Sequence, residues 1–223
     1  MKPDMERRTY EAELRVDVAG YGKKNPTIRG YAAKFNTLSQ SMPIYDEGQQ
    51  IGTFREMLIP GCFATALATS DIRSLFNHDP NLIMGRNISG TLRLKEDEIG
   101  LYFENDPPET SYSKDLQISL QRGDVNQCSF GFNVSPGGDE YKKDPEIANG
   151  YIRSIRLISK LYDASPVTYP AYLDTECAVR SIISNLKAEE EAVAKAAKEV
   201  EEAERRQQLY IKRKQLELAS IDI

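Results

Sequence analysis

The chain has 223 residues, of which 40% are hydrophobic and 28% are charged, a composition that is typical of a folded protein and excludes a disordered one. Its 29 basic and 34 acidic residues give a net charge of −5, so nothing indicates non-specific binding to nucleic acid. No apolar run approaches the roughly 18 residues of a membrane span, and residues 1–10 lack the apolar core of a secretory signal. We therefore expect no membrane association, and a protein that stays in the cytosol where it is made.

Up to about residue 184 the sequence favours short strands. Alternating or short apolar runs predict them, in chain order, at residues 10–18, 27–35, 72–76, 91–95, 100–104, 125–134 and 151–161. The fourth and fifth of these flank an acidic turn and form a β-hairpin, which Pro107 and Pro108 end. Residues 135–149, between the last two strands, are rich in glycine, proline and charge and are expected to form a loop.

Two short helices are predicted among these strands. Residues 61–69 follow Pro60 and read as the first of them. Residues 110–122 form the second, because Tyr112, Leu116 and Leu120 recur on one helical face. Serine and threonine residues at its start can cap it, and Gly123 can terminate it.

The composition changes sharply after Ser184. Residues 186–218 contain no glycine or proline and are dense in alanine, glutamate, lysine, arginine, glutamine and leucine, which predicts a long helix. Leu186, Val193 and Val200 recur every seven residues, as in a short coiled-coil seam. Such a helix either packs against a partner or remains a solvated, partly frayed extension.

These segments together predict two domains and an α+β fold. Residues 1–184 form a globular domain, and residues 185–223 form a helical C-terminal extension. The globular domain is expected to be a mainly antiparallel sheet or barrel with one or two short packed helices.

The three cysteines, Cys62, Cys128 and Cys177, are widely spaced and form no CxxC pair. The pattern argues against a disulfide framework and a zinc site and favours reduced, mostly buried thiols. With a single histidine in the chain, no metal is expected, and no cofactor either.

Three residues are candidates for chemistry. His78, the only histidine, follows the apolar strand 72–76, and an imidazole can take up and return a proton near neutral pH. Ser129 lies in a strand-like segment with its side chain on the face opposite Cys128, and Gly131 leaves space on the Ser129 face. Asp163 follows an apolar strand and could orient the imidazole, since a Ser–His pair needs such a third group.

Each candidate also has a purely structural interpretation. A lone histidine is more often structural than catalytic, a small serine can simply be packed beside a bulge, and an aspartate before a turn often caps it. The residue patterns alone do not decide between these interpretations.

In combination these residues resemble the tailed-phage prohead (capsid-maturation) serine proteases, a family distantly similar to herpesvirus assemblin. The resemblance spans about residues 8–180 and depends on the order and spacing of several segments rather than on any single one. These segments are residues 28–36 (IRGYAAKFN), 54–63 (FREMLIPGCF), 75–80 (LFNHDP), 90–94 (GTLRL), 129–132 (SFGF), 161–165 (LYDAS) and 169–171 (YPA).

The resemblance implies a serine endopeptidase with a β-barrel core ringed by helices. It carries the family's histidine to His78 and its serine to Ser129. The acidic residue of the L-x-E-x-S pattern falls at Asp163, where this sequence has an aspartate in place of the usual glutamate. Cys128 likewise stands where an apolar residue is usual.

The resemblance also implies a role and a place. Such proteases are enclosed in the immature capsid, or prohead, in the host-cell cytoplasm. They cleave the scaffold protein or the scaffolding arm of the major capsid protein, and then themselves. The helical segment 185–223 fits a targeting or self-association role and is expected to be removed by self-cleavage near residues 180–192.

Two alternatives remain. One is a non-enzymatic capsid scaffold with a degenerate protease domain, against which the presence of all three candidate residues argues. The other is a cysteine nucleophile at Cys128, which a regular strand would point away from the face of Ser129. A hydrogen bond between His78 and Ser129 in the folded chain would discriminate among these interpretations.

Overall fold

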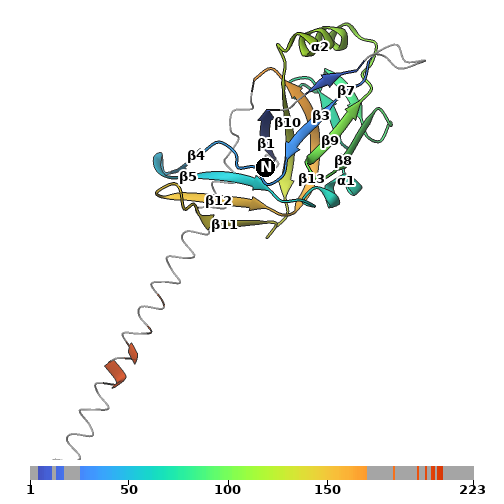
Figure 1. Cartoon of the computed structure of the whole chain (residues 1–223). Helices are drawn as coiled ribbons and strands as arrows, with labels where there is room; N and C mark the ends of the chain where they lie inside the picture. Colours follow the sequence, from blue (N-terminus) through green and yellow to red (C-terminus); the bar gives the residue numbers. More distant parts are fainter. Residues whose placement is uncertain are drawn as a thin grey trace, which may run out of the picture. The chain divides into compact units, whose positions relative to one another are not determined.

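A computed structural model of the chain describes residues 5–11, 14–17 and 26–169 and, beyond these, residues 183, 195, 199, 202–203 and 205–207. The chain divides into two compact units, residues 1–179 and 180–223. Within the described residues, the first unit consists of three β-sheets and two short α-helices (Figure 1). The predicted α+β class is therefore confirmed, whereas the predicted domain boundary after residue 184 stays a prediction.

The five-stranded sheet contains Ser129 and Asp163, and the turn between two of its strands contains His78. Its strands, in spatial order, are β1 (Glu6–Glu11), β10 (Gln127–Val134), β13 (Ile158–Val167), β6 (Arg73–Leu75) and β7 (Ile83–Arg86). Neighbours are antiparallel except β13 and β6, which are parallel. One face of β10 packs into the core, where Cys128, Phe130 and Phe132 are fully buried.

The other two sheets have four strands each. One has the order β11 (Asp139–Lys143), β12 (Gly150–Ile155), β5 (Gln49–Leu58) and β4 (Met42–Asp46), and the other β2 (Arg15–Val16), β3 (Ile28–Lys34), β9 (Gly100–Asn105) and β8 (Leu92–Glu96). Among the described residues no hydrogen-bonded strand pair joins one sheet to another. A closed barrel requires an unbroken ring of paired strands, so the predicted barrel is not confirmed.

Side-chain packing joins the layers instead. The ring of Phe63 meets that of Phe130 edge-on at 5.5 Å, and Phe130 stacks on Phe132 at 4.9 Å. Both geometries are favourable aromatic arrangements. The catalytic candidates therefore lie on a sheet whose other face is fixed by a tightly packed aromatic core.

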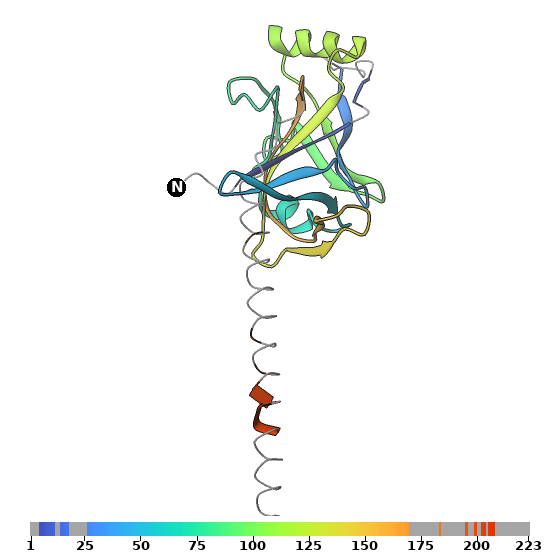
Figure 2. The same ribbon diagram turned by 90° about the vertical axis from the view of Figure 1, so that its left-hand side faces the viewer.

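The two helices match the sequence pattern with one difference at a cap. α1 (Ala64–Thr69) and α2 (Ser111–Arg122) correspond to the predicted helices, and Leu116 and Leu120 of α2 are buried as expected. Gly123 ends α2 in a left-handed conformation, with φ of 82°. Thr110 occupies the N-cap position, but its hydroxyl makes no capping hydrogen bond. Figures 1 and 2 show α2 at the end of the unit opposite β4, β5, β11 and β12.

Most of the predicted strands are confirmed. The predictions at residues 27–35, 72–76, 91–95, 100–104 and 125–134 correspond to β3, β6, β8, β9 and β10. The prediction at residues 10–18 overlaps the end of β1 and covers β2. The sequence pattern did not indicate β4, β5 or β7.

The structure differs from two predictions, the single strand at residues 151–161 and the loop at residues 135–149. The strand is broken at Arg156 and Leu157, whose amide N–H groups both donate to the Gly138 carbonyl oxygen at 2.7 and 3.0 Å. β12 lies before this break, and β13 after it continues to Val167. The predicted loop 135–149 contains β11, which pairs with β12. A Cβ atom on Gly138 would lie 2.5 Å from the Leu157 carbonyl oxygen, so this close approach requires glycine.

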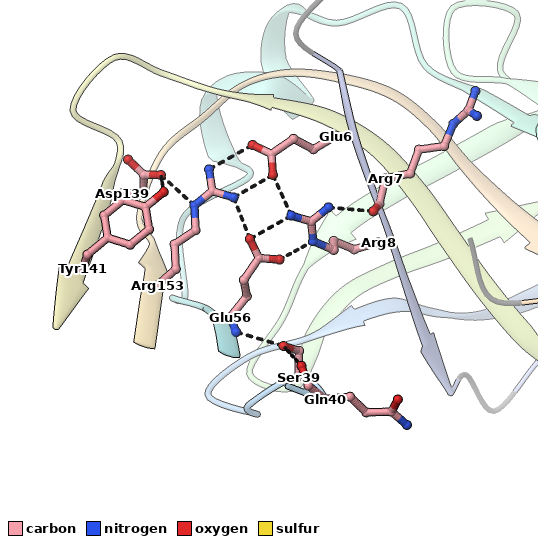
Figure 3. Close-up of polar contacts among 9 residues, drawn as sticks. All are labelled: Glu6, Arg7, Arg8, Ser39, Gln40, Glu56, Asp139, Tyr141 and Arg153. Carbon is pink, nitrogen blue, oxygen red and sulfur yellow. Dashed lines mark hydrogen bonds and ion pairs between the residues drawn. The ribbon is translucent and has the colours of Figure 1, made fainter. Parts of the chain in front are cut away.

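A buried cluster of charges connects β1 to the sheet of β5 and β12 (Figure 3). Arg153 of β12 bonds Glu6 and Glu56, each at 2.6 Å, and Arg8 bonds the same two carboxylates. The four side chains are at most 6% exposed, and Asp139 adds a fifth partner at 2.7 Å from Arg153. Each buried charge therefore has an opposite partner, as burial of charge requires.

The predicted helix 186–218 lies largely outside the described residues and stays a prediction. Among the few residues described there, Glu202 and Arg206 are helical and form an ion pair at 3.3 Å. None of the helices in the described part of the chain is long and apolar enough to cross a membrane.

Candidate active site

The strand register brings Ser129 and Asp163 onto one face of the five-stranded sheet. Ser129 of β10 pairs with Ser165 of β13, and Gly131 pairs with Asp163. Directly paired residues in an antiparallel sheet project to the same side. Ser129, Gly131, Asp163 and Ser165 therefore share a surface, which we call the catalytic face. The opposite face carries the core residues of β10.

A strained turn presents His78 to this face. The turn follows β6, and both Asn77 and His78 have left-handed backbones, with φ of 55° and 58°. Such conformations are costly for residues with side chains and persist where surrounding contacts hold them. Here the Asn77 amide donates to the Pro166 carbonyl at 3.0 Å, and the Thr168 amide donates to the Asn77 side-chain oxygen at 2.8 Å. The end of β13 thus fixes the turn.

The imidazole of His78 is bound to the carboxylate of Asp163. The distance from Nδ1 to Oδ1 is 2.9 Å, and the two side chains are 9% and 6% exposed. A carboxylate is an acceptor, so Nδ1 carries the proton in this pair and the neutral ring keeps an acceptor lone pair on Nε2. The shorter aspartate, in place of the family's glutamate, still reaches the ring.

Ser165 is a residue of this site to which the sequence pattern assigned no role. Its hydroxyl donates to Asp163 Oδ1 at 3.2 Å and accepts the Leu75 amide N–H at 3.1 Å. It is fully buried and links β6, which leads into the His78 turn, to the carboxylate. The L-x-E-x-S spacing held the signal, since residues two apart in a strand share a face.

The reactive atoms of the proposed pair have no partner within the described residues. Both His78 Nε2 and Ser129 Oγ are buried without a hydrogen bond. They are therefore not bonded to each other in this structure, and the discriminating hydrogen bond is not observed. Buried polar atoms are rarely left unpaired, and catalytic hydrogen bonds often tighten only once substrate is bound.

Cys128 lies on the wrong face to serve His78. It is fully buried in the core, opposite the catalytic face, as strand alternation predicted. Burial, together with the negative charge of Asp163, raises the pKa of its thiol far above the usual value. Burial and Glu96 likewise raise the pKa of Cys62. Both thiols are free and buried, as expected, whereas Cys177 lies outside the described residues.

In the described part of the chain no three histidine, cysteine, aspartate or glutamate side chains come together as a metal-binding group. Arg153 lies in the buried charge cluster, away from the catalytic face.

The family relationship agrees with this geometry. The chain belongs to the caudovirus prohead serine protease family, whose model matches residues 12–189. That range contains His78, Ser129 and Asp163. No curated protein and no solved structure matches the chain. Membership of this family indicates a serine peptidase of capsid maturation that acts on phage capsid proteins within the prohead.

Proposed function

We propose that this protein is a serine endopeptidase in which Ser129 is the nucleophile, His78 the general base and Asp163 the group that orients the base. The observation that supports it most is the His78 Nδ1–Asp163 Oδ1 bond of 2.9 Å. Nε2 of the same ring has no hydrogen-bond partner among the described residues, and Asp163 shares the sheet face of Ser129. The protease domain comprises residues 1–184.

The proposed reaction uses these groups in two halves. Ser129 Oγ attacks the peptide carbonyl carbon while His78 Nε2 accepts the hydroxyl proton, and the negative charge of Asp163 stabilises the imidazolium that forms. His78 then gives the proton to the departing amine, which leaves an acyl-enzyme. A water molecule, deprotonated by His78, hydrolyses that ester and restores the serine.

The proposed nucleophile is buried in this structure, so a substrate cannot reach it without a local movement. Ser129 has no exposed surface, so a peptide can contact Oγ only after neighbouring residues move. We expect the same movement to bring Nε2 and Oγ into hydrogen-bond contact. Asp163 stays in position meanwhile, because Ser165 and the Asn77 contacts hold both partners of the His–Asp pair.

The proposed substrates are the scaffold protein or the scaffolding arm of the major capsid protein, and the protease itself. Cleavage occurs inside the prohead, and digestion of the scaffold clears space for DNA. The segment 185–223 directs the protease into the prohead or mediates its self-association. Self-cleavage then removes this segment at a site within residues 180–192, since a junction between a folded domain and a helix is a preferred site of proteolysis.

Co-expression with the cognate capsid protein tests the proposal, with mass spectrometry of the fragments. The wild type should produce defined fragments, and Ser129→Ala should produce none, because losing a nucleophile can slow such a reaction about a millionfold. His78→Ala should be equally inactive, and the double variant no worse than either. Fragments from a well-folded Ser129→Ala protein at the wild-type rate would exclude this nucleophile. Absence of cleavage by the wild type would instead favour the non-enzymatic scaffold.

A further inference from the structure

A row of arginines crosses the catalytic face beside Asp163. The register aligns one residue from each strand of the five-stranded sheet: Arg7, Gly131, Asp163, Arg73 and Arg86. Paired residues in a sheet project to the same side, so these arginines share the face of the His–Asp pair. Positive charge thus extends from the catalytic carboxylate toward the edge strand β7.

Two of these arginines form an open pair around a single carboxylate. Arg86 binds Asp71 through Nε at 2.7 Å and Nη2 at 2.6 Å, and Arg73 binds it through Nη2 at 3.1 Å. The hydrogen bonds from Arg86 hold the pKa of Asp71 below its usual value, so the aspartate remains charged. Two guanidinium groups and one carboxylate leave a net charge of +1.

The Arg73–Arg86 pair is exposed to solvent and can still donate hydrogen bonds to a ligand. The side chains of Arg73 and Arg86 are 39% and 41% exposed. Within the described residues, Nε of Arg73 and Nη1 of Arg86 donate no hydrogen bond. A guanidinium with free N–H groups suits a second carboxylate, which it binds with directional hydrogen bonds.

The distance from Ser129 fits a substrate subsite. Arg73 lies two strands away from Ser129 and two residues farther along the sheet. Strands are about 4.8 Å apart and rise about 3.4 Å per residue, so the separation is about 12 Å along the sheet. An extended peptide covers that distance in three or four residues.

We propose that Arg73 and Arg86 form a subsite for an acidic side chain of the substrate, three or four residues from the cleaved bond. This inference rests on the proposed peptidase function and specifies its substrate class. The chain itself carries a matching sequence, because Glu189, Glu190 and Glu191 lie at the proposed self-cleavage region. The arginine pair thereby selects acidic segments for cleavage.

Peptide substrates test the subsite. The fragments from co-expression define a cleaved sequence, and peptides of that sequence are made with Glu, Gln or Lys at each of the third to fifth positions on either side of the cut. At one of these positions the wild type should cleave the Glu peptide about tenfold better than the Gln peptide in kcat/KM, with the difference in KM, as expected for one partly exposed charged hydrogen bond. Arg73→Gln and Arg86→Gln should each abolish that preference, and Arg73→Glu should favour Lys.

Arg93→Gln is the matched control. Arg93 is 43% exposed and also pairs with two carboxylates, those of Glu104 and Asp106, but it lies in the sheet of β8 and β9. This variant should keep the wild-type preference. Equal cleavage of Glu and Gln peptides by the wild type at every position would overturn the subsite while the peptidase function stands. A wild type that cleaves no peptide or capsid protein would overturn the peptidase function, and the subsite with it.

Discussion

Replacing Ser165 with alanine should slow catalysis, because it removes a hydrogen bond that positions the Asp163 carboxylate. The substitution removes the 3.2 Å hydrogen bond to the carboxylate. A hydrogen bond to a charged group contributes about 1.5–3 kcal/mol, and each ~1.4 kcal/mol of lost transition-state stabilisation is a factor of about ten in rate. The bond is long, so we expect the low end, roughly a 10- to 30-fold loss. The Leu75 amide also loses its acceptor, which should cost about 1–3 kcal/mol of folding stability.

The assay separates the two effects. Steady-state kinetics on a cleaved peptide should show that kcat falls while KM is unchanged, because Ser165 contacts the orienting carboxylate of Asp163 and is not expected to contact the substrate. Urea unfolding measures the loss of stability independently. Ser165→Cys keeps a weak donor and should fall between the wild type and Ser165→Ala.

Ser74→Ala is the matched control for this experiment. Ser74 is a fully buried serine of the neighbouring strand β6, and its hydroxyl has no hydrogen-bond partner among the described residues. Its loss should leave kcat unchanged. A Ser165→Ala protein with wild-type kcat would refute the positioning role, as would an equal fall in Ser74→Ala.

Three further predictions follow from other parts of the molecule. Cys128→Ala should keep most of the activity, because the thiol faces the core, and an inactive but folded variant would reopen the cysteine alternative. Glu56→Gln should lose about 3–5 kcal/mol of unfolding free energy at pH 7, since it leaves Arg8 and Arg153 undercompensated in a buried cluster. Burial would raise the pKa of Glu56, but the two arginines hold it below its usual value. Urea unfolding should therefore show that the wild type loses this stability as the pH falls through the lowered pKa, whereas the variant does not. A chain ending at Asn185 should fold and cleave but be absent from purified proheads, and equal incorporation by immunoblot would contradict the targeting role.

Local patterns predicted the elements that have a regular period. The alternation in 125–134 correctly separated the face of Ser129 from that of Cys128, and the helical spacing in 110–122 located α2. The pattern failed for β4 and β5, where Pro43 and Gly52 interrupt the apolar alternation that marks a strand. Such strands form because pairing with neighbours overrides weak local preference.

The site was predicted less completely, because much of it depends on register. The order of family segments indicated His78, Ser129 and Asp163, and the structure places a bond between two of them. The spacing of Asp163 and Ser165 predicts that they share a strand face, but the hydrogen bond from the Leu75 amide to Ser165 depends on which residues of β13 lie beside β6, and no local pattern specifies that. The charge cluster joins residues up to 147 positions apart, as in the pair of Arg153 with Glu6. Local sequence patterns therefore could not predict it either.

The most direct test of the central claim is to identify the serine that reacts with a fluorophosphonate, a reagent that modifies activated serine hydroxyls. A preparation shown to cleave the capsid protein is treated with the reagent, digested and analysed by mass spectrometry. We predict one adduct, on Ser129, with cleavage lost in proportion to labelling and no adduct in His78→Ala. An active preparation that is inhibited through an adduct elsewhere, or that labels Ser129 equally without His78, would contradict the proposed nucleophile and base.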